Sequence, residues 1–157
     1  MLEIVYYSSP VGNLKIESKN GQLWSVSMAK EVNLVKNNNP LLAEAIRQFD
    51  EYFAGRRKNF DLPLAWRGTS FQIKVWQTLL KIPYGQTWSY QELAHSIGQI
   101  TASRAVGNAN KANLLMIIVP CHRVIRANGE IGGYGSGELI KKHLLDLEKQ
   151  SSGYCKQ

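Results

Sequence analysis

The stretch "SYQELAHSIGQITASRAVGNANKA" (Ser89–Ala112) decides the fold that we predict for this chain. Ser89 and Glu92 form the S-x-x-E pattern of a capping box, in which each side chain binds a backbone N–H at the start of a helix. Gly98 is typical of the residue that ends a helix, and a second helical segment follows it within a few residues. Two short helices joined by a turn of about three residues that contains a glycine predict a helix-turn-helix.

The second of these helices has unusually small side chains. Thr101 or Ser103 can cap its first turn, and Arg104 is its one long side chain before Lys111. Small side chains allow a helix backbone to approach a partner closely, which suits both another helix and the groove of a nucleic acid. The small residues are Ala102, Ser103, Ala105, Gly107, Asn108 and Ala109.

One further helix is predicted on each side of this motif. Ser70 can cap the first, and the second runs from about Glu138 to Lys149. Glu148 lies at the edge of the apolar face of this last helix, where it is either exposed or held half-buried by a partner. The predicted inner faces are Phe71, Val75, Leu79 and Ile82 on the first helix and Ile140, Leu144 and Leu147 on the second.

The first third of the chain has the pattern of a small sheet followed by one helix. Asn20 and Gly21 lie between two alternating runs, which is the strongest short-range indication of a β-hairpin. The stretch Asp61–Ser70 contains Pro, Gly and small polar residues and is interpreted as a linker. We therefore predict two domains, residues 1–65 and 66–157. The apolar face of the helix in the first domain consists of Leu42, Ile46, Phe49 and Phe53.

The composition is that of a folded and basic protein. Of the 157 residues, 44% are hydrophobic, and 19 Lys and Arg against 12 Asp and Glu give a formal net charge of +7. A balance this basic suggests a polyanionic partner such as a nucleic acid or a membrane surface. A basic soluble enzyme has the same balance, so charge alone leaves both classes open.

The two cysteines, Cys121 and Cys155, are too few for a disulfide framework. The N-terminus lacks the layout of a signal peptide, and no apolar run approaches the roughly 18–20 residues of a membrane span. We therefore expect a cytoplasmic protein with free thiols and no membrane association. Cys155 lies in a polar tail and is interpreted as incidental.

Cys121 and His122 follow the apolar run "NLLMIIVP" (Asn113–Pro120), which we interpret as a buried strand or extended segment. A zinc site needs three or four ligands at characteristic spacing, and the sequence offers no such set, so no metal is predicted. Two roles stay open for the cysteine at this point. It is either a small buried structural residue, as cysteines often are, or a nucleophile.

Several neighbours favour the nucleophile. Arg123 or Arg126 would lower the pKa of the Cys121 thiol, because positive charge favours the thiolate. Glu148 can orient His122, which completes a Cys-His-acid arrangement. Adjacent residues in a regular strand point to opposite sides, so a hydrogen bond between the cysteine and the histidine requires a turn or a bridging water.

The motif "PCHRV" (Pro120–Val124) resembles the O6-alkylguanine-DNA alkyltransferases, also called methylated-DNA–protein-cysteine methyltransferases. The same resemblance extends to "SRAVGNANKAN" before the motif and "GGYGSGELIKKHLLDLE" after it. It is continuous from about Phe71 to Glu148 and weaker over the first 65 residues. It implies an α+β fold, in which a small N-terminal α/β domain of RNase H-like type precedes a mainly helical domain. This second domain is of the winged helix-turn-helix type and contains the active-site cysteine.

The resemblance also implies a reaction. Cys121 would accept the alkyl group of O6-alkylguanine in DNA irreversibly and once, and O4-alkylthymine is a second candidate substrate. His122 would take the thiol proton through a water, and Glu148 would hold His122. Asn113 would stabilise the active-site segment. Tyr90 would lie near the flipped nucleotide, where it donates a proton to the leaving guanine or crowds its 3′ phosphate.

For DNA binding, the resemblance implies that the second helix of the motif docks in the minor groove of double-stranded DNA. Arg104 would fill the gap that the flipped base leaves. The resemblance implies no cofactor, and we expect a monomer. The other predicted DNA-binding residues are Ala102, Ser103, Gly107, Asn108, Lys111 and Tyr90. The predicted base pocket consists of the main chain of Cys121 and Val124 and the loop residues Tyr134, Gly135 and Ser136.

The chain departs from the family pattern at three places. Leu114 stands where a proline usually follows the asparagine, and Met116 lies where smaller or cyclic residues are common. The loop "YGSG" (134–137) replaces the Ser or Ala followed by two glycines that family members more often have. These changes affect the path of the chain into the site and the size of the alkyl group that it admits.

Two alternative functions compete with alkyl transfer. The first is that of the alkyltransferase-like proteins, which flip a damaged base and transfer nothing, but these usually have tryptophan in place of Cys121. The second is a thiol hydrolase that uses Cys121, His122 and Glu148 with turnover. A hydrolase leaves Arg104 and the helix-turn-helix without a role.

Overall fold

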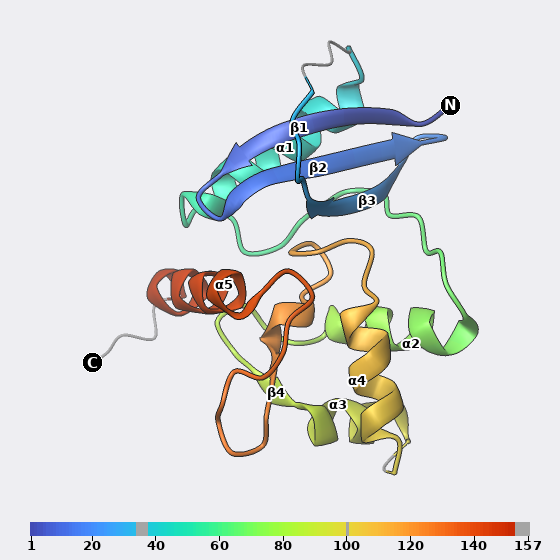
Figure 1. The fold of residues 1–157 in the computed structure, drawn as a ribbon, viewed down its shortest axis with the longest axis vertical. Helices are drawn as coiled ribbons and strands as arrows, with labels where there is room; N and C mark the ends of the chain where they lie inside the picture. Colours follow the sequence, from blue (N-terminus) through green and yellow to red (C-terminus); the bar gives the residue numbers. More distant parts are fainter. Residues whose placement is uncertain (34–37, 100, 153–157) are drawn as a thin grey trace. The chain divides into compact units, whose positions relative to one another are not determined.

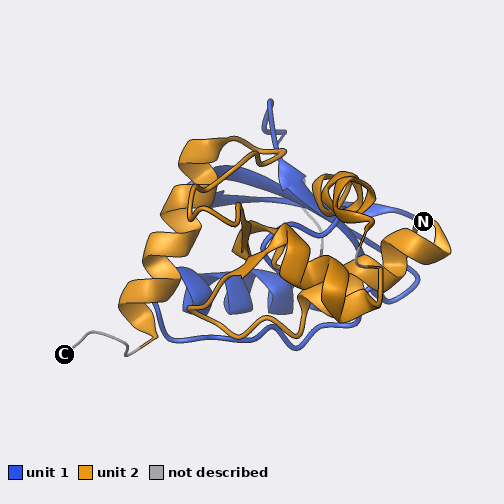
Figure 2. Cartoon of the chain, turned by 90° about the horizontal axis from the view of Figure 1, so that it is seen from below, with its two compact units in different colours: residues 1–66, 114–118 blue, residues 67–113, 119–157 orange. Residues whose placement is uncertain are grey.

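The structure is a computed structural model that describes residues 1–33, 38–99 and 101–152, so Cys155 lies outside the described residues. It divides into two compact units (Figure 2). Unit 1 consists of Met1–Trp66 and Leu114–Ile118, and unit 2 consists of Arg67–Asn113 and Val119–Gln157. The chain thus leaves the second unit for a short segment just before Cys121. In the described ranges, no helix is long and apolar enough to cross a membrane.

Unit 1 contains a three-stranded antiparallel sheet with its strands in sequence order (Figure 1). These strands are β1 (Glu3–Ser9), β2 (Gly12–Lys19) and β3 (Gln22–Met28). Lys19 pairs with Gln22, so Asn20 and Gly21 form a two-residue turn. Their φ angles are +53° and +75°, and a type I′ turn requires positive φ at both positions. The predicted hairpin is confirmed.

Helix α1 (Pro40–Phe53) packs against all three strands of the sheet (Figure 1). Asn39 caps it, because its side chain accepts hydrogen bonds from the first backbone N–H groups of the helix. The predicted apolar face is only partly right, since Ile46 and Phe53 are half-buried. The stripe is rotated slightly from the prediction, because Tyr52 packs its ring 5.4 Å from that of Phe60. The buried residues are Leu42, Ala45, Gln48, Phe49 and Tyr52.

The apolar run before the cysteine is buried but is not a regular strand. Leu115 makes an isolated parallel bridge with Val26, where the Val26 N–H donates to the Leu114 carbonyl at 2.9 Å and the Met116 N–H donates to the Val26 carbonyl at 3.3 Å. Ile117 then adopts a φ of +73°, which costs a β-branched residue about 1–3 kcal/mol. The chain bends after one bridge, so the strand interpretation is wrong.

Unit 2 contains four α-helices, a short pair of parallel strands and one 3-10 turn in its described part. Its elements are α2 (Ser70–Leu79), β4 (Trp88–Ser89), α3 (Tyr90–Ile97), α4 (Ser103–Lys111), the 3-10 turn (Cys121–Arg123), β5 (Val124–Ile125) and α5 (Glu138–Ser151). Helices α2, α3 and α4 pack against one another, and α3 and α4 form the predicted helix-turn-helix (Figure 1). Strand β4 pairs with β5, which follows the turn that contains the cysteine.

The start of α3 agrees with the predicted capping box, and the start of α2 does not. The Ser89 hydroxyl accepts the Glu92 N–H at 3.0 Å, while the Glu92 side chain accepts the Ser89 N–H at 2.8 Å. The prediction that Ser70 caps α2 is wrong. Thr69 is the cap, because the Gln72 side chain reaches back to its N–H and completes a second capping box.

Helices α4 and α5 also differ from prediction in detail. Neither Thr101 nor Ser103 caps α4, because its N-cap is Ala102 and no side chain binds the first turn. The buried face of α5 is made by Lys141, Leu144 and Glu148, and the predicted Ile140 and Leu147 are half-buried. The reason is polar, since Lys141 and Glu148 both find partners in the interior.

We expect Thr69→Ala to lower the free energy of unfolding by about 1 kcal/mol, because α2 loses the hydroxyl that binds its first turn. Urea denaturation followed by circular dichroism measures the change. Thr69→Ser keeps the hydroxyl and is expected to retain the stability of the parent. Equal midpoints for the alanine variant and the parent would contradict this role of the cap.

Candidate active site

Cys121 lies at the first position of the 3-10 turn of unit 2. The turn begins after Pro120, and the Arg123 N–H donates to the Pro120 carbonyl at 3.0 Å. The Cys121 N–H donates to the Val119 carbonyl at 2.8 Å, so the backbone on both sides of the thiol is fixed. Cys121 is 5% exposed. The cysteine is therefore almost completely buried.

Asn113 holds this turn through its side-chain amide. Its Nδ2 donates to the Val119 carbonyl at 2.8 Å and to the Cys121 Sγ at 3.2 Å. A hydrogen bond from a neutral amide stabilises a thiolate more than a thiol. Asn113 thus both anchors the segment and favours the reactive form of the cysteine.

His122, Glu148 and Arg123 form a buried charged cluster behind the cysteine. The His122 Nε2 lies 2.6 Å from the Glu148 Oε2. The Arg123 Nε donates to Glu148 Oε1 at 2.7 Å and its Nη2 donates to Oε2 at 3.1 Å, while Nη1 donates to the Ile82 carbonyl at 2.9 Å. His122 and Glu148 are 0% and 1% exposed. Both oxygens of the Glu148 carboxylate are therefore hydrogen-bonded within the protein.

The charges in this cluster decide which atom can accept a proton. Burial alone would raise the pKa of Glu148, but the interactions with His122 and Arg123 outweigh it and hold the pKa well below its ordinary range. Burial lowers the pKa of His122, although Glu148 opposes this. The carboxylate accepts the Nε2–H of the neutral imidazole, so the lone pair of His122 is on Nδ1.

His122 makes no direct hydrogen bond to the thiol. Its Nδ1 is buried and has no partner among the residues that the structure describes. Burial raises the pKa of Cys121, while Asn113, the Tyr134 hydroxyl and the charge of Lys141 oppose the rise. The thiol is therefore neutral at rest and needs a base before it becomes a strong nucleophile.

Lys141 of α5 is a buried cation beside the same site. Its ammonium donates to the carbonyls of Val124 at 2.6 Å, Ile131 at 2.7 Å and Gly133 at 3.2 Å. Burial lowers the pKa of Lys141 to about 8, although Cys121 opposes this. The lysine fixes the loop before α5 and adds positive potential near the thiol.

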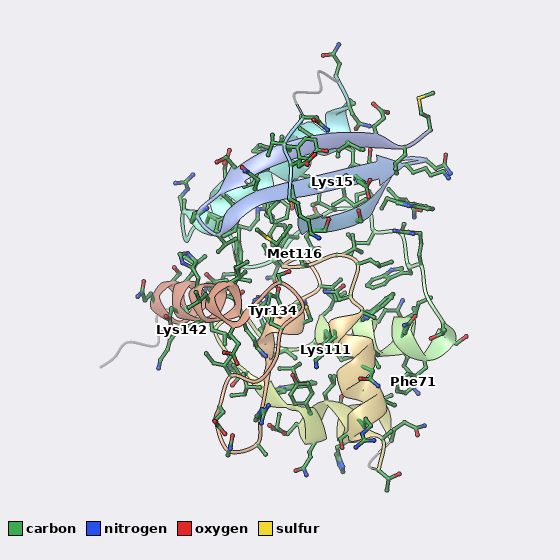
Figure 3. All side chains as sticks on the ribbon, in the orientation of Figure 1. Lys15, Phe71, Lys111, Met116, Tyr134 and Lys142 are labelled. Atoms are coloured by element: carbon green, nitrogen blue, oxygen red, sulfur yellow. The ribbon has the colours of Figure 1, made fainter. Side chains whose placement is uncertain are left out.

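A basic groove of about 390 Å³ lies on the same unit. Arg104 and Lys111 come from α4, Arg126 from the loop after β5, and Tyr90 from the start of α3. Figure 3 shows Lys111 at the end of α4 and Tyr134 on the loop before α5. The groove is lined by Tyr90, Ser103, Arg104, Gly107, Asn108, Lys111, Arg126 and Gly133.

Tyr90 lines this groove and lies near the thiol. Burial raises the pKa of Tyr90, a thiolate at Cys121 would raise it further, and Arg126 opposes the rise. A Cβ atom on Gly132 would lie 3.3 Å from Arg126 and 3.6 Å from the Tyr90 hydroxyl. The tyrosine therefore keeps its proton and can donate it.

Comparison with known proteins gives the family. Residues 4–66 match the model of the 6-O-methylguanine DNA methyltransferase ribonuclease-like domain, and residues 70–150 match that of the 6-O-methylguanine DNA methyltransferase DNA binding domain. The methylated-DNA–protein-cysteine methyltransferase of Methanosarcina acetivorans is 46% identical over 148 residues, which cover 90% of this chain and 95% of that protein. The chain belongs to the methylated-DNA–protein-cysteine methyltransferase family.

Solved structures of this family have the same fold. The Mycobacterium tuberculosis O6-methylguanine methyltransferase is 41% identical, with a TM-score of 0.88 over 99% of this chain and 97% of that one. The structure of the M. tuberculosis protein OGT in complex with DNA is 43% identical, with a TM-score of 0.84 over 96% and 93% of the two chains. The predicted α+β fold, with an N-terminal ribonuclease-like domain and a helical DNA-binding domain, is confirmed.

The site residues predicted from the sequence fall into three places in unit 2. Cys121, His122, Glu148 and Asn113 come together around the turn, and Tyr90 interacts electrostatically with the thiol. Of the predicted DNA-binding residues, only Ala102 does not line the groove. Of the predicted base pocket, Val124 is buried, Tyr134 and Ser136 are half-buried, and Gly135 is exposed.

Sequence reasoning missed several residues of the site. Lys141 has the spacing of the buried face, three residues before Leu144 and seven before Glu148, and this spacing could have revealed it. Arg123 was expected to act on the thiol, whereas it binds Glu148. Arg126 was predicted only as a cation that acts on the thiol, and neither Arg126 nor Gly133 was predicted to line the groove. Within the described ranges, no three His, Cys, Asp or Glu side chains form a possible metal site.

We expect Lys141→Met to lower the free energy of unfolding by about 2 kcal/mol at neutral pH, because three backbone carbonyls lose their donor. The pKa of Lys141 is about 8 in the folded protein and 10.5 as its ordinary value. Between these pH values Lys141 is protonated in the unfolded chain and neutral in the folded protein. The stability of the parent relative to the variant should therefore rise as the pH increases through this window.

Chemical denaturation at several pH values measures this difference. Lys142→Met is the matched control, because Lys142 is the next residue, its side chain is 59% exposed, and it pairs with Asp146 on the surface of α5 (Figure 3). It should change stability by less than about 0.5 kcal/mol at every pH. A Lys141 variant as stable as this control would show that the three contacts contribute nothing.

Proposed function

We propose that this chain repairs alkylated DNA by moving the alkyl group from O6 of guanine to the Cys121 sulfur. One observation supports this most strongly. A buried thiol, bound by Asn113 and backed by the His122–Glu148 pair, lies on the same unit as a helix-turn-helix with a basic groove. Nucleophile, base and nucleic-acid surface are thus parts of one small unit.

DNA binding would use the exposed side of α4. Ser103, Arg104 and Asn108 are exposed on this helix, and their short neighbours allow its backbone to approach a groove closely. The cations Arg104, Lys111 and Arg126 would contact phosphates. An alkylated and mispaired guanine is cheaper to extrude than a normal base, and Arg104 would occupy the space that it leaves.

The transfer itself would be a direct displacement. The proton of the Cys121 thiol passes through a water to the Nδ1 of His122, and the resulting imidazolium is stabilised by Glu148. The thiolate forms a bond to the alkyl carbon while the bond between this carbon and O6 breaks. Tyr90 donates a proton to the leaving guanine, and the proton held by the His122 imidazolium then restores the Tyr90 hydroxyl through the water. The product is a thioether with no leaving route, so each molecule acts once.

All of these groups come from unit 2 of a single chain, which supports a protein that acts as a monomer on double-stranded DNA. The proposed division into domains is residues 1–65 and 66–157, with the alkyl transfer in the second domain. A nucleophilic thiol has to stay reduced, which supports a cytoplasmic location. The preferred substrate is proposed to be O6-alkylguanine, with O4-alkylthymine as a second substrate.

Incubation with a double-stranded oligonucleotide that contains O6-methylguanine tests the function. We expect the Cys121 peptide to gain the mass of one methylene group, because a methyl group replaces the thiol hydrogen. At most one methyl group should be transferred per protein molecule. Cys121→Ala should bind the same DNA and accept nothing. The matched unmodified oligonucleotide is the control for substrate specificity.

Other results would overturn the proposal. Tight binding of the damaged DNA without any mass gain on Cys121 would indicate a lesion-binding protein. Turnover of a thioester or peptide substrate, dependent on Cys121 and Glu148 but not on Arg104, would indicate a hydrolase. Transfer to Cys155 instead of Cys121 would show that the buried site is not the acceptor.

The salt dependence of DNA binding tests the groove. We expect Lys111→Gln to weaken binding to any duplex and to reduce the slope of log K against log salt concentration by about 1, because one phosphate contact is lost. Fluorescence anisotropy at several salt concentrations measures the slope. Lys142→Gln removes the same charge from α5 outside the groove, and its slope should match the parent. Equal slopes for both variants would place Lys111 outside the interface.

A further inference from the structure

Asn110 is a buried amide on α4 that none of the steps above uses. It is 2% exposed, and its Nδ2 lies 3.3 Å from the main-chain carbonyl oxygen of Cys121. A carbonyl oxygen can only accept a hydrogen bond, so the amino group of the amide has to face it. The amide oxygen then points elsewhere. This Oδ1 is buried and has no partner in the described part of the chain.

The Nδ1 of His122 is a second polar atom that is buried without a hydrogen-bond partner in the described ranges. Its lone pair is free because Nε2 binds Glu148. Both atoms belong to residues next to the cysteine, since Asn110 binds its carbonyl and His122 follows it in sequence. Buried polar atoms in folded proteins are nearly always bonded to protein or to ordered water. A buried water makes about three hydrogen bonds.

We propose that Asn110 is a positioning residue for proton removal from Cys121. Its Nδ2 fixes the main chain of the cysteine, and its Oδ1 holds, together with the Nδ1 of His122, the water through which the thiol proton leaves. This inference rests on the proposed function only in taking Cys121 as the nucleophile. Asn110 itself touches neither the alkyl group nor the base.

The proton balance agrees with these three contacts. The water accepts the hydrogen of the Cys121 thiol, donates one hydrogen to the Nδ1 of His122 and donates the other to the Oδ1 of Asn110. Transfer of one proton along this path leaves a thiolate and an imidazolium, which the Glu148 carboxylate stabilises. Asn110 accepts throughout and changes neither its charge nor its protonation.

Asn110 and Asn113 have separate tasks in this arrangement. Asn110 lies in the last turn of α4, and Asn113 follows the C-cap of this helix, Ala112. Asn113 binds the sulfur and the Val119 carbonyl, whereas Asn110 binds the Cys121 carbonyl. The first stabilises the thiolate once formed, and the second orients the path by which the proton departs.

The pH dependence of Cys121 alkylation by iodoacetamide tests the proposal without DNA. We expect Asn110→Leu to move the midpoint of the profile upward by about one pH unit, which lowers the rate below the midpoint about tenfold, because one buried hydrogen-bond path is lost. The intact chain is used, and the Cys121 peptide is followed by mass spectrometry because Cys155 also has a thiol. The titratable and charged groups around the thiol are His122, Arg123, Tyr90, Arg126, Tyr134, Lys141 and Glu148, and all are kept.

Two further variants separate positioning from folding. Asn110→Ser is smaller and is used where the leucine variant does not fold, and its midpoint should also rise. Gln48→Leu removes another buried amide, which binds the Asp61 backbone in unit 1, and should lower stability without moving the midpoint. Thermal unfolding of each variant is measured in parallel.

Each outcome decides. A folded Asn110 variant with the pH profile of the parent would overturn the proposal. An equal shift in Gln48→Leu would also overturn it, because the shift would then report general destabilisation. If the parent accepts no methyl group from DNA while the Asn110 midpoint still rises, the proposed function fails and the role of Asn110 stands.

Discussion

The buried carboxylate of Glu148 is the group on which the rest of the site depends. It is bound by His122 at 2.6 Å and by two nitrogens of Arg123 at 2.7 and 3.1 Å. Removal of one partner from such a pair costs about 3–5 kcal/mol, because a charge then remains unpaired in the interior. Helix α5 must therefore stay packed against the turn that contains the cysteine. Arg123 also binds the Ile82 carbonyl, which ties this turn to the segment after α2.

The same carboxylate controls the chemistry of its neighbours. By accepting the Nε2–H of His122 it fixes the tautomer that leaves Nδ1 as a base. Burial keeps the Cys121 thiol neutral, so the sulfur is protected from adventitious reagents until a proton acceptor acts on it. On the proposed mechanism, in which each molecule reacts once, this restraint is useful because every stray alkylation would consume one molecule. The Glu148 carboxylate thus contributes both to the packing of the turn and to the control of the thiol.

The sequence predicted the parts of this structure that depend on local pattern. The Asn20-Gly21 hairpin and the Ser89 capping box are confirmed, because each requires only neighbouring residues. The apolar run before the cysteine was misread, since hydrophobicity does not show where a chain bends at Ile117. Lys141 was also missed: its spacing places it on the buried face of α5, but its three acceptors are backbone carbonyls, which a sequence does not reveal.

Helix α4 is a short element with little local stabilisation, although it lies next to the candidate site. Its first turn has no side-chain cap, and it contains Gly107, which costs about 1 kcal/mol relative to alanine. Compensation comes from its far end, where Trp76 donates to the Ala109 carbonyl at 2.8 Å and Asn110 binds the Cys121 carbonyl. The start of the helix is thus exposed, while its end is fixed to the main chain of Cys121. Because one helix joins the two, a displacement of α4 in the DNA binding that we propose would be transmitted to the main chain of Cys121.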